Sequence, residues 1–242
     1  MNPRQTYSCI SCRLSKCPVR VCSEEWKEKL DSVKITRIYP KKQNIYWQGM
    51  AASGVYFINS GKVSIVAEIG QEKDQIVRLL KEGDVFGIPS RDEKTSFIFS
   101  SFALDDSVIC FIDNKNITPA LYENPEFSVT LLYYYIRSMQ KIEIRLRNLA
   151  RMSAREKVAD AILFLHSVYG AQKQNNASVL EIKMSQRDLG KLCSLSEEMV
   201  CRTLKGLTDE KLVSANGKNI AITNFGGLMK IVSDFPSLYL ES

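Results

Sequence analysis

SQRDLGKLCSLSEEMVCRTLKGL, residues 185–207, carries the signals of two short helices joined by a tight turn. Ser185 is placed to cap a helix that runs to about Leu192, and Ser196 to cap a second helix that ends at about Leu207. The sequence CSLS, residues 193–196, forms the turn between them. We therefore predict a helix-turn-helix, a motif whose second helix enters the major groove of DNA.

The residues around this motif extend it into a larger domain. Residues 154–165 have a helical pattern, and GAQKQNNAS, residues 170–178, is expected to be a polar loop. After the motif, LVSA and NIAI are β-type runs that flank Asn216-Gly217, a favoured two-residue hairpin turn. A helix, turn, helix and hairpin in this order predict a winged helix within residues 151–242.

The pattern of apolar residues upstream predicts a different architecture. From Val33 to Ile112 the chain has short runs rich in Val, Ile, Phe and Tyr, separated by turn residues. This spacing is typical of an antiparallel β barrel or sandwich. Ser23 to Ser32 is expected to form a short helix before it, with Ser23 as the cap.

A single long helix is predicted from Pro119 to Leu149, with a largely apolar stripe along it. The β domain could cover the first half of this stripe, and a second copy of the helix is the economical partner for the rest. Packing within one chain alone is the alternative. The predicted dimer contacts are Leu131, Tyr135, Ser138, Ile142, Leu146 and Leu149.

Composition limits the class of protein. The chain has 242 residues, 45% of them apolar, with 33 basic and 27 acidic residues and a formal charge of +6, which only weakly suggests an anionic partner. No apolar run approaches the ~20 residues that span a bilayer, and the first residues lack the apolar core of a secretory signal. We therefore expect a cytoplasmic protein without a membrane partner, in which clustered thiols bind metal rather than form disulfides.

The predicted second helix of the motif carries a pair suited to reading bases. Glu198 and Arg202 are four residues apart and hence on one face. A guanidinium can donate two hydrogen bonds to guanine, and a carboxylate can accept one from cytosine. The alternative is a surface ion pair worth about 0.3–0.5 kcal/mol. The other predicted DNA contacts are Ser196, Glu197 and Cys201 beside this pair, and Arg187, Lys205 and Lys218 at phosphates.

In this order of parts the whole chain resembles the CRP/FNR family of bacterial transcription regulators. The resemblance rests on YPKKQNIYWQG (39–49), VYFINSGKVSI (55–65), LLKEGDVFG (79–87), the long helix and residues 185–207, including the spacing of Glu198 and Arg202. It implies an α+β fold with a cysteine-rich arm (1–24), an antiparallel β-roll like a cyclic-nucleotide-binding domain (25–118), a dimerisation helix (119–150) and a winged helix-turn-helix (151–242). It also implies a homodimer on an inverted-repeat promoter site, and RNA polymerase as a partner. Cys201 stands where the FNR branch has serine.

The resemblance does not extend to cyclic nucleotide binding. Family members that bind cAMP use a Gly-Glu-Leu stretch and, about ten residues later, an arginine for the phosphate. Here the first stretch is Gly87-Ile88-Pro89, which lacks the carboxylate, and residues 96–103, SFIFSSFA, contain no basic residue. We therefore predict that this chain does not bind cAMP.

Four cysteines lie in residues 9–22, CISCRLSKCPVRVC. The FNR branch binds a [4Fe-4S] cluster through three N-terminal cysteines and one in a late strand of the roll. The resemblance therefore implies Cys9, Cys12, Cys17 and Cys110 as ligands, with Cys22 as a substitute for Cys9 or Cys17. Such a cluster would sense oxygen, nitric oxide or redox state.

Other readings of the cysteines remain open. The four N-terminal thiolates could bind zinc, with Cys110 a core residue, or the thiols could act as a redox switch without a cofactor. The roll could instead sense a small molecule other than cAMP. An iron-sulfur carrier or enzyme is the alternative of another class, but a carrier has no use for a winged helix. We do not predict an enzyme, because the sequence shows no nucleophile with its base and no phosphate loop.

Overall fold

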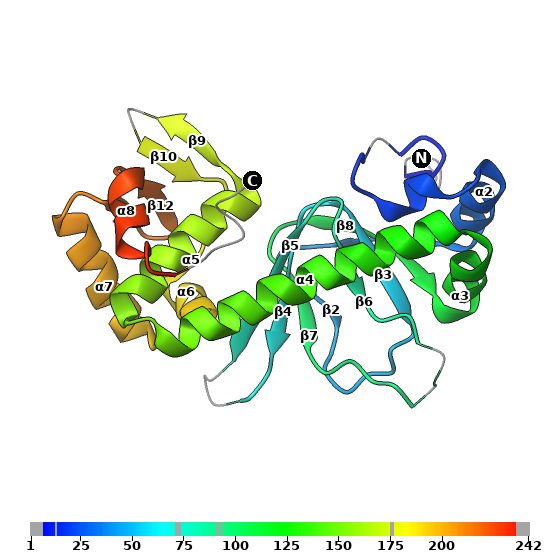
Figure 1. Cartoon of the computed structure of the whole chain (residues 1–242), viewed down its shortest axis with the longest axis horizontal. Helices are drawn as coiled ribbons and strands as arrows, with labels where there is room; N and C mark the ends of the chain where they lie inside the picture. The colour runs from blue at the N-terminus through cyan, green and yellow to red at the C-terminus, as the bar shows by residue number, and fades with distance from the viewer. Residues whose placement is uncertain are drawn as a thin grey trace. The chain divides into compact units, whose positions relative to one another are not determined.

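The computed structural model describes residues 7–12, 14–70, 74–90, 92, 94–174 and 177–235. It confirms the predicted class: a β-roll, a long helix and a winged helix-turn-helix follow one another along the chain (Figure 1). The chain divides into two compact units, and the division falls within the long helix, between Met139 and Gln140. The long helix is therefore shared between units. Among the described residues, no helix is long and apolar enough to cross a membrane.

Two four-stranded antiparallel sheets form the roll, with strand orders β1-β8-β3-β6 and β2-β7-β4-β5. This confirms the short strands predicted between Val33 and Ile112. In β6, Gly87 has a φ of +89°, and a Cβ there would lie 2.7 Å from the Gly54 carbonyl oxygen, so glycine is required. The strands are β1 (Ile35–Tyr39), β2 (Asn44–Tyr46), β3 (Gly54–Ser60), β4 (Lys62–Ala67), β5 (Gln75–Lys81), β6 (Val85–Gly87), β7 (Ser100–Ala103) and β8 (Ser107–Asp113).

Aromatic rings fill the interior of the roll. The Tyr46 ring stacks on Phe97 with centroids 3.9 Å apart, and the Tyr56 ring stacks on Phe86 at 5.0 Å. These residues belong to one buried cluster with Ile58, Val63, Ile65, Leu80 and Ile109, drawn from both sheets. The interior of the roll is thus occupied by the protein's own side chains.

Helix α2 (Glu24–Val33) begins at the predicted cap, because the Ser23 hydroxyl accepts a hydrogen bond from the Trp26 amide. Its buried face, Trp26 and Leu30, joins a second apolar cluster on the outside of the β1-β8-β3-β6 sheet. That cluster also contains Phe127 and Leu131, which come from the long helix.

The prediction of one helix from Pro119 to Leu149 is wrong. The structure has two helices, α3 (Asn114–Glu123) and α4 (Pro125–Arg151), separated at Asn124. Proline lacks an amide hydrogen and disfavours helical backbone in the residue before it, so Pro125 starts a new helix. Asn124 is buried: its side-chain nitrogen donates to the Ala120 carbonyl, and its side-chain oxygen accepts from the Ser23 amide.

The second unit has the predicted winged helix with two differences. Residues 170–178, predicted as a loop, contain strands β9 (Ala171–Gln174) and β10 (Ala177–Leu180); residues 175 and 176 lie outside the described residues. Asn216 pairs with Asn219, so the wing turns at Gly217-Lys218, one residue later than predicted. The four strands form one sheet in the order β11-β12-β10-β9. The remaining elements are α5 (Ala154–Tyr169), α6 (Gln186–Cys193), α7 (Glu197–Asp209), β11 (Val213–Asn216), β12 (Asn219–Ile222) and α8 (Phe225–Ile231).

The C-terminal part of α4 is fixed to the winged helix by a partly buried arginine. Arg145 donates a hydrogen bond to the Leu192 carbonyl at the end of α6, and its guanidinium lies 4.8 Å from the centre of the Phe164 ring in α5. The buried carboxyl of Asp160 lies near it, and burial raises the pKa of Asp160 to about 6, against the opposing effect of Arg145. This packing holds the long helix against the helices that carry the DNA-binding motif.

Candidate metal centre and nucleic-acid interface

The four cysteines predicted as ligands face one small cavity in the first unit. Cys9, Cys12 and Cys17 reach it from the N-terminal arm, and Cys110 reaches it from β8. In the sheet, Cys110 lies between Thr36 of β1 and Phe57 of β3. The fold therefore brings Cys110 to the arm, although about a hundred residues separate them in the chain.

Cys22 does not share this position. It is 4% exposed and packs in the apolar cluster with Val19, Trp26 and Leu30. It is not among the residues that line the cavity. The 3-10 helix η1 (Pro18–Val21) separates Cys17 from Cys22 and carries the chain from the cavity into the core. In this structure Cys22 is therefore a packing residue, and its role as a substitute ligand stays a prediction.

Burial favours the protonated form of three cavity thiols, those of Cys9, Cys17 and Cys110. It raises the pKa of Cys9 to about 12 and of Cys17 to about 12, and it also raises the pKa of Cys110. The negative charges that these groups would carry also repel one another, which adds to the shifts. A metal that binds here must displace protons from the thiols, and its positive charge would offset the cost of burying thiolates.

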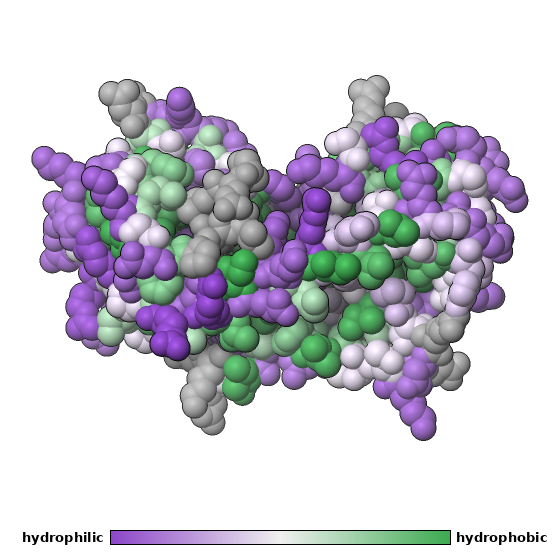
Figure 2. All heavy atoms as spheres, viewed as in Figure 1, coloured by the Kyte–Doolittle hydropathy of each residue, from purple (hydrophilic) through white to green (hydrophobic). Residues whose placement is uncertain are grey.

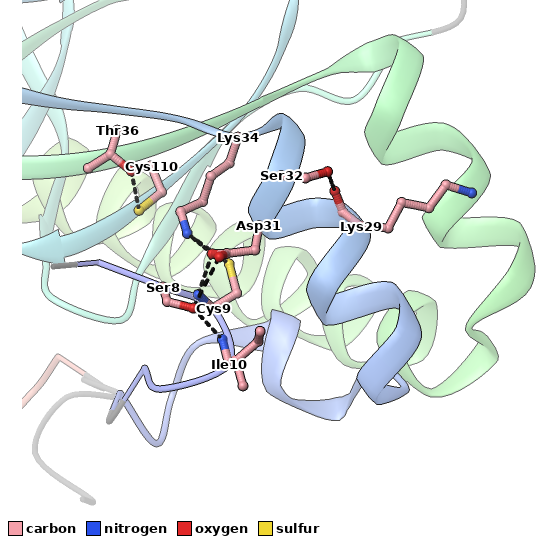
Figure 3. A network of polar contacts seen from close by, with 9 residues as sticks. All are labelled: Ser8, Cys9, Ile10, Lys29, Asp31, Ser32, Lys34, Thr36 and Cys110. Atoms are coloured by element: carbon pink, nitrogen blue, oxygen red, sulfur yellow. Dashed lines mark hydrogen bonds and ion pairs between the residues drawn. The ribbon is translucent and has the colours of Figure 1, made fainter. Parts of the chain in front are cut away.

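A polar network closes one side of the cavity (Figure 3). The Cys9 amide donates to the Asp31 carboxylate at 2.6 Å, and the Ser8 hydroxyl donates to the same carboxylate at 3.1 Å. The Lys34 ammonium forms an ion pair with Asp31 and also donates to the Cys9 sulfur at 3.5 Å. Asp31 and Lys34 are not among the residues predicted from the sequence, because their spacing at the end of α2 gives no sign that they lie beside the cysteines.

The four cavity thiols have the donor chemistry of a [4Fe-4S] cluster. In the parts of the chain that the structure describes, no group of three or more His, Cys, Asp or Glu side chains is arranged to hold one metal ion. Zinc with four bonds of about 2.3 Å would require sulfur atoms about 3.8 Å apart. In a [4Fe-4S] cluster each thiolate binds a different iron atom, so the ligands are spread around a larger object. Four thiols around one cavity fit that requirement.

The helix-turn-helix has the geometry predicted from residues 185–207. The Ser185 hydroxyl accepts from the Asp188 amide to cap α6, and the Ser196 hydroxyl accepts from the Met199 amide to cap α7. A Cβ on Gly190 would lie 2.7 Å from the Leu195 carbonyl oxygen, so glycine allows the turn to approach α6. Val200, Leu204 and Leu207 are the buried side of α7.

The opposite side of α7 is exposed and carries the predicted base readers. Arg202 is exposed, and its guanidinium contacts the sulfur of Met199 at 3.0 Å. Within the described residues Arg202 forms no ion pair with Glu198, so the surface ion pair weighed as the alternative is not observed. The other predicted DNA contacts are also at the surface: Arg187, Ser196, Glu197, Glu198, Cys201, Lys205 and, in the wing turn, Lys218.

The β-roll and the helix-turn-helix each match a known domain family. Residues 36–124 match the cyclic nucleotide-binding domain family, and residues 156–231 match the Crp-like helix-turn-helix domain family. The chain belongs to the CRP/FNR family of transcription regulators. It is thus a DNA-binding transcription regulator, and α7 is the recognition helix of its Crp-like domain.

Several relatives of this regulator are known. It is 26% identical over 188 residues to the cAMP-activated global transcriptional regulator CRP of Salmonella typhimurium, covering 76% of this chain and 87% of the relative. It is 23% identical over 193 residues to the Anaerobic regulatory protein of Bacillus subtilis, covering 79% and 81%. Among solved structures, FixK2 from Bradyrhizobium japonicum shares the fold, with a TM-score of 0.70, 22% identity and coverage of 82% and 97%.

The predicted dimer contacts of the regulator are placed on different sides of α4. Leu131 is 3% exposed and packs in the core of its own unit, so the prediction is wrong for this residue. Tyr135 packs beside it and donates a hydrogen bond from its hydroxyl to the Gly87 carbonyl at 3.2 Å, so it also faces its own roll. Leu146 is 68% exposed, as expected of a contact with a second chain. Ser138, Ile142 and Leu149 are partly buried.

The apolar face that α4 leaves uncovered is shifted from the predicted stripe. Leu132, Met139 and Leu146 are exposed and follow one another at intervals of seven residues, and Val129 and Tyr133 are exposed beside them. Figure 2 shows apolar side chains along the surface where α4 runs. Apolar residues that repeat every seven positions are typical of a helix that pairs with another helix.

Proposed function

We propose that this regulator senses oxygen, nitric oxide or redox state through a [4Fe-4S] cluster held by Cys9, Cys12, Cys17 and Cys110. The observation that carries the proposal is the position of these four thiols around one cavity, with Cys110 supplied by a strand distant in sequence. The name of the Bacillus subtilis relative, Anaerobic regulatory protein, supports an oxygen-linked signal.

The cluster would supply four bonds that tie the arm to β8, and the chain's own packing would pass this constraint to α4. Val19 of the arm and Trp26 of α2 share an apolar cluster with Phe127 and Leu131 of α4. The Ser23 amide, near the end of the arm, donates to the Asn124 side chain, directly before α4. Loss of the bonds would free the arm and change the packing against which α4 rests.

A second connection runs from the roll to α4 through two tyrosines. The Val85 amide in β6 donates to the Tyr134 hydroxyl at 3.0 Å, and the Tyr135 hydroxyl donates to the Gly87 carbonyl. Strand β6 pairs with β3, which in turn pairs with the strand that carries Cys110. The first half of α4 is therefore fixed to the sheet that contains Cys110 and to α2, the helix that follows the cysteine arm.

Anaerobic purification tests the proposal. We expect a brown protein with visible absorption and about four iron and four sulfide per chain, both lost on exposure to air. Four equivalents of thiol should become accessible to a thiol reagent in the denatured protein only after the iron is removed. A colourless, iron-free protein that still binds its promoter DNA would refute the proposal. If that protein contained one zinc ion per chain, the zinc site would be favoured over the cluster.

We further propose that two chains pair through α4 and place two recognition helices on an inverted repeat, with RNA polymerase as the eventual partner. The exposed row of Leu132, Met139 and Leu146 supports pairing. Apolar side chains at seven-residue spacing are stabilised when a partner helix covers them and removes them from water.

Leu146→Glu is expected to shift the protein from dimer to monomer and to weaken DNA binding, because two buried carboxylates would face each other across the helix pair. Analytical ultracentrifugation measures the mass in solution. Ile98→Glu is the matched control, since Ile98 is 65% exposed on the roll and apolar like Leu146. A dimer in both variants would contradict pairing through this row.

A further inference from the structure

Lys34 is a buried cation on the wall of the cysteine cavity. Its side chain is only 4% exposed, although it belongs to a residue type that is almost never fully buried. Removing an ammonium from water costs several kcal/mol unless partners compensate it. Two partners lie within reach: the Asp31 carboxylate and the sulfur of Cys9.

The charges around the cavity make this position unusual. Of the residues that line it in the described part of the chain, only Lys34 and Arg20 carry a formal charge, and both are basic. Arg20 is exposed at the surface, whereas Lys34 is inside. The cavity wall thus has a buried positive charge directed at a sulfur atom and no carboxylate among its lining residues.

Asp31 holds both groups in this geometry. Its carboxylate accepts hydrogen bonds from the Cys9 amide at 2.6 Å and from the Ser8 hydroxyl at 3.1 Å, and it forms an ion pair with Lys34 (Figure 3). The hydrogen bond from the Cys9 amide fixes the backbone of Cys9. The ion pair fixes the Lys34 ammonium 3.5 Å from the Cys9 sulfur. One carboxylate at the end of α2 therefore positions a ligand and its hydrogen-bond donor together.

We infer that Lys34, held by Asp31, is a positioning residue for the cluster that donates a hydrogen bond to the Cys9 thiolate and stabilises its charge. This inference rests on the proposed function. Four thiolates bring more negative charge into a buried site than the surrounding apolar side chains can stabilise, and a charge-assisted hydrogen bond to one of them reduces this cost. Lys34 would therefore set how firmly the cluster is retained, since its ammonium contacts the Asp31 carboxylate and the Cys9 sulfur.

Lys34→Met tests this role, because methionine keeps an apolar stem and removes the ammonium. Wild type and variant are reconstituted anaerobically, and iron retention is measured against a ferrous chelator. We expect retention to fall by about 10- to 100-fold, the usual effect of losing an outer-shell partner. We also expect the midpoint potential for one-electron reduction of the cluster to become more negative, since a nearby positive charge favours the added electron.

Two further variants separate charge from packing. Lys34→Arg keeps the charge and a donor and should restore retention to near the wild-type value. Lys27→Met is the matched control, because Lys27 makes the same kind of ion pair on α2, with Glu24 at 2.7 Å, but does not line the cavity. It should retain iron like wild type.

The outcomes distinguish this inference from the proposed function. If wild type holds no cluster, the proposed function fails and the inference fails with it. If wild type holds a cluster and Lys34→Met retains it equally well at an unchanged potential, only the inference is overturned. If Lys34→Met and Lys34→Arg lose iron equally and the metal-free forms of both unfold at a lower temperature than wild type, Lys34 is structural and the inference is also overturned.

Discussion

Arg202→Ala is expected to abolish specific DNA binding while the protein remains folded. Arg202 is exposed on α7 and is not engaged by Glu198, so its guanidinium is available to a base. A bidentate contact is worth about 1–3 kcal/mol, and a dimer makes it twice, so the affinity should fall by a factor of roughly 30 to 25,000. Fluorescence anisotropy with a duplex selected by the wild-type protein measures this loss.

The comparison that shows specificity uses a second DNA and a second variant. On a scrambled duplex, Arg202→Ala should bind nearly as well as wild type, because the lost contact is to a base. Lys205→Ala removes a predicted phosphate contact from the same exposed side. It should therefore weaken binding to both duplexes alike and lower the salt dependence of the affinity. Equal affinity of wild type and Arg202→Ala for the selected duplex would show that Arg202 does not read a base.

Cys110→Ser should yield a protein that loses almost all of its iron. Serine is nearly the same size, and Cys110 is only partly buried beside Thr36, so the sheet should form normally. The cluster would have three thiolates in place of four, and its link between the arm and β8 would be missing. Iron and sulfide should fall to less than about a tenth of wild type after anaerobic reconstitution, with loss of visible absorption.

Cys22→Ala is the matched control from the same arm. Cys22 is buried in the apolar cluster and does not line the cavity, so its removal should leave the iron content unchanged. It should lower the free energy of unfolding by about 1 kcal/mol, because a small cavity replaces the sulfur. If Cys110→Ser kept its iron and Cys22→Ala lost it, the ligand set would be the four N-terminal cysteines.

Local sequence signals predicted most of the helices and strands correctly. The caps Ser23, Ser185 and Ser196 act where the sequence placed them, because a hydroxyl that accepts from an amide three residues later depends on neighbouring residues alone. The short runs rich in Val, Ile, Phe and Tyr, separated by turn residues, likewise predicted the strands of the roll. Polar strands escaped this rule: β9 has mostly exposed residues, so its sequence resembles a loop.

Sequence periodicity did not predict which side of α4 is exposed. Leu131 and Leu132 are adjacent and equally apolar, yet one is buried in the core and the other is exposed. The helix is interrupted at Asn124, so α4 begins at Pro125. The roll then covers one side of α4. Which leucine faces a partner therefore depends on the packing of α4 against its own roll, which the sequence pattern alone does not contain.

For this regulator, the sequence by itself determined the order of parts, the helix-turn-helix and the set of candidate cysteines. Those features follow from residue type and spacing within a few turns of the chain. The tertiary structure decided that Cys110 meets Cys9, Cys12 and Cys17 while Cys22 does not. It also placed Lys34 and Asp31 beside Cys9. These choices depend on the pairing of β8 with β1 and β3 and on the packing of α2, which are contacts between residues far apart in the chain.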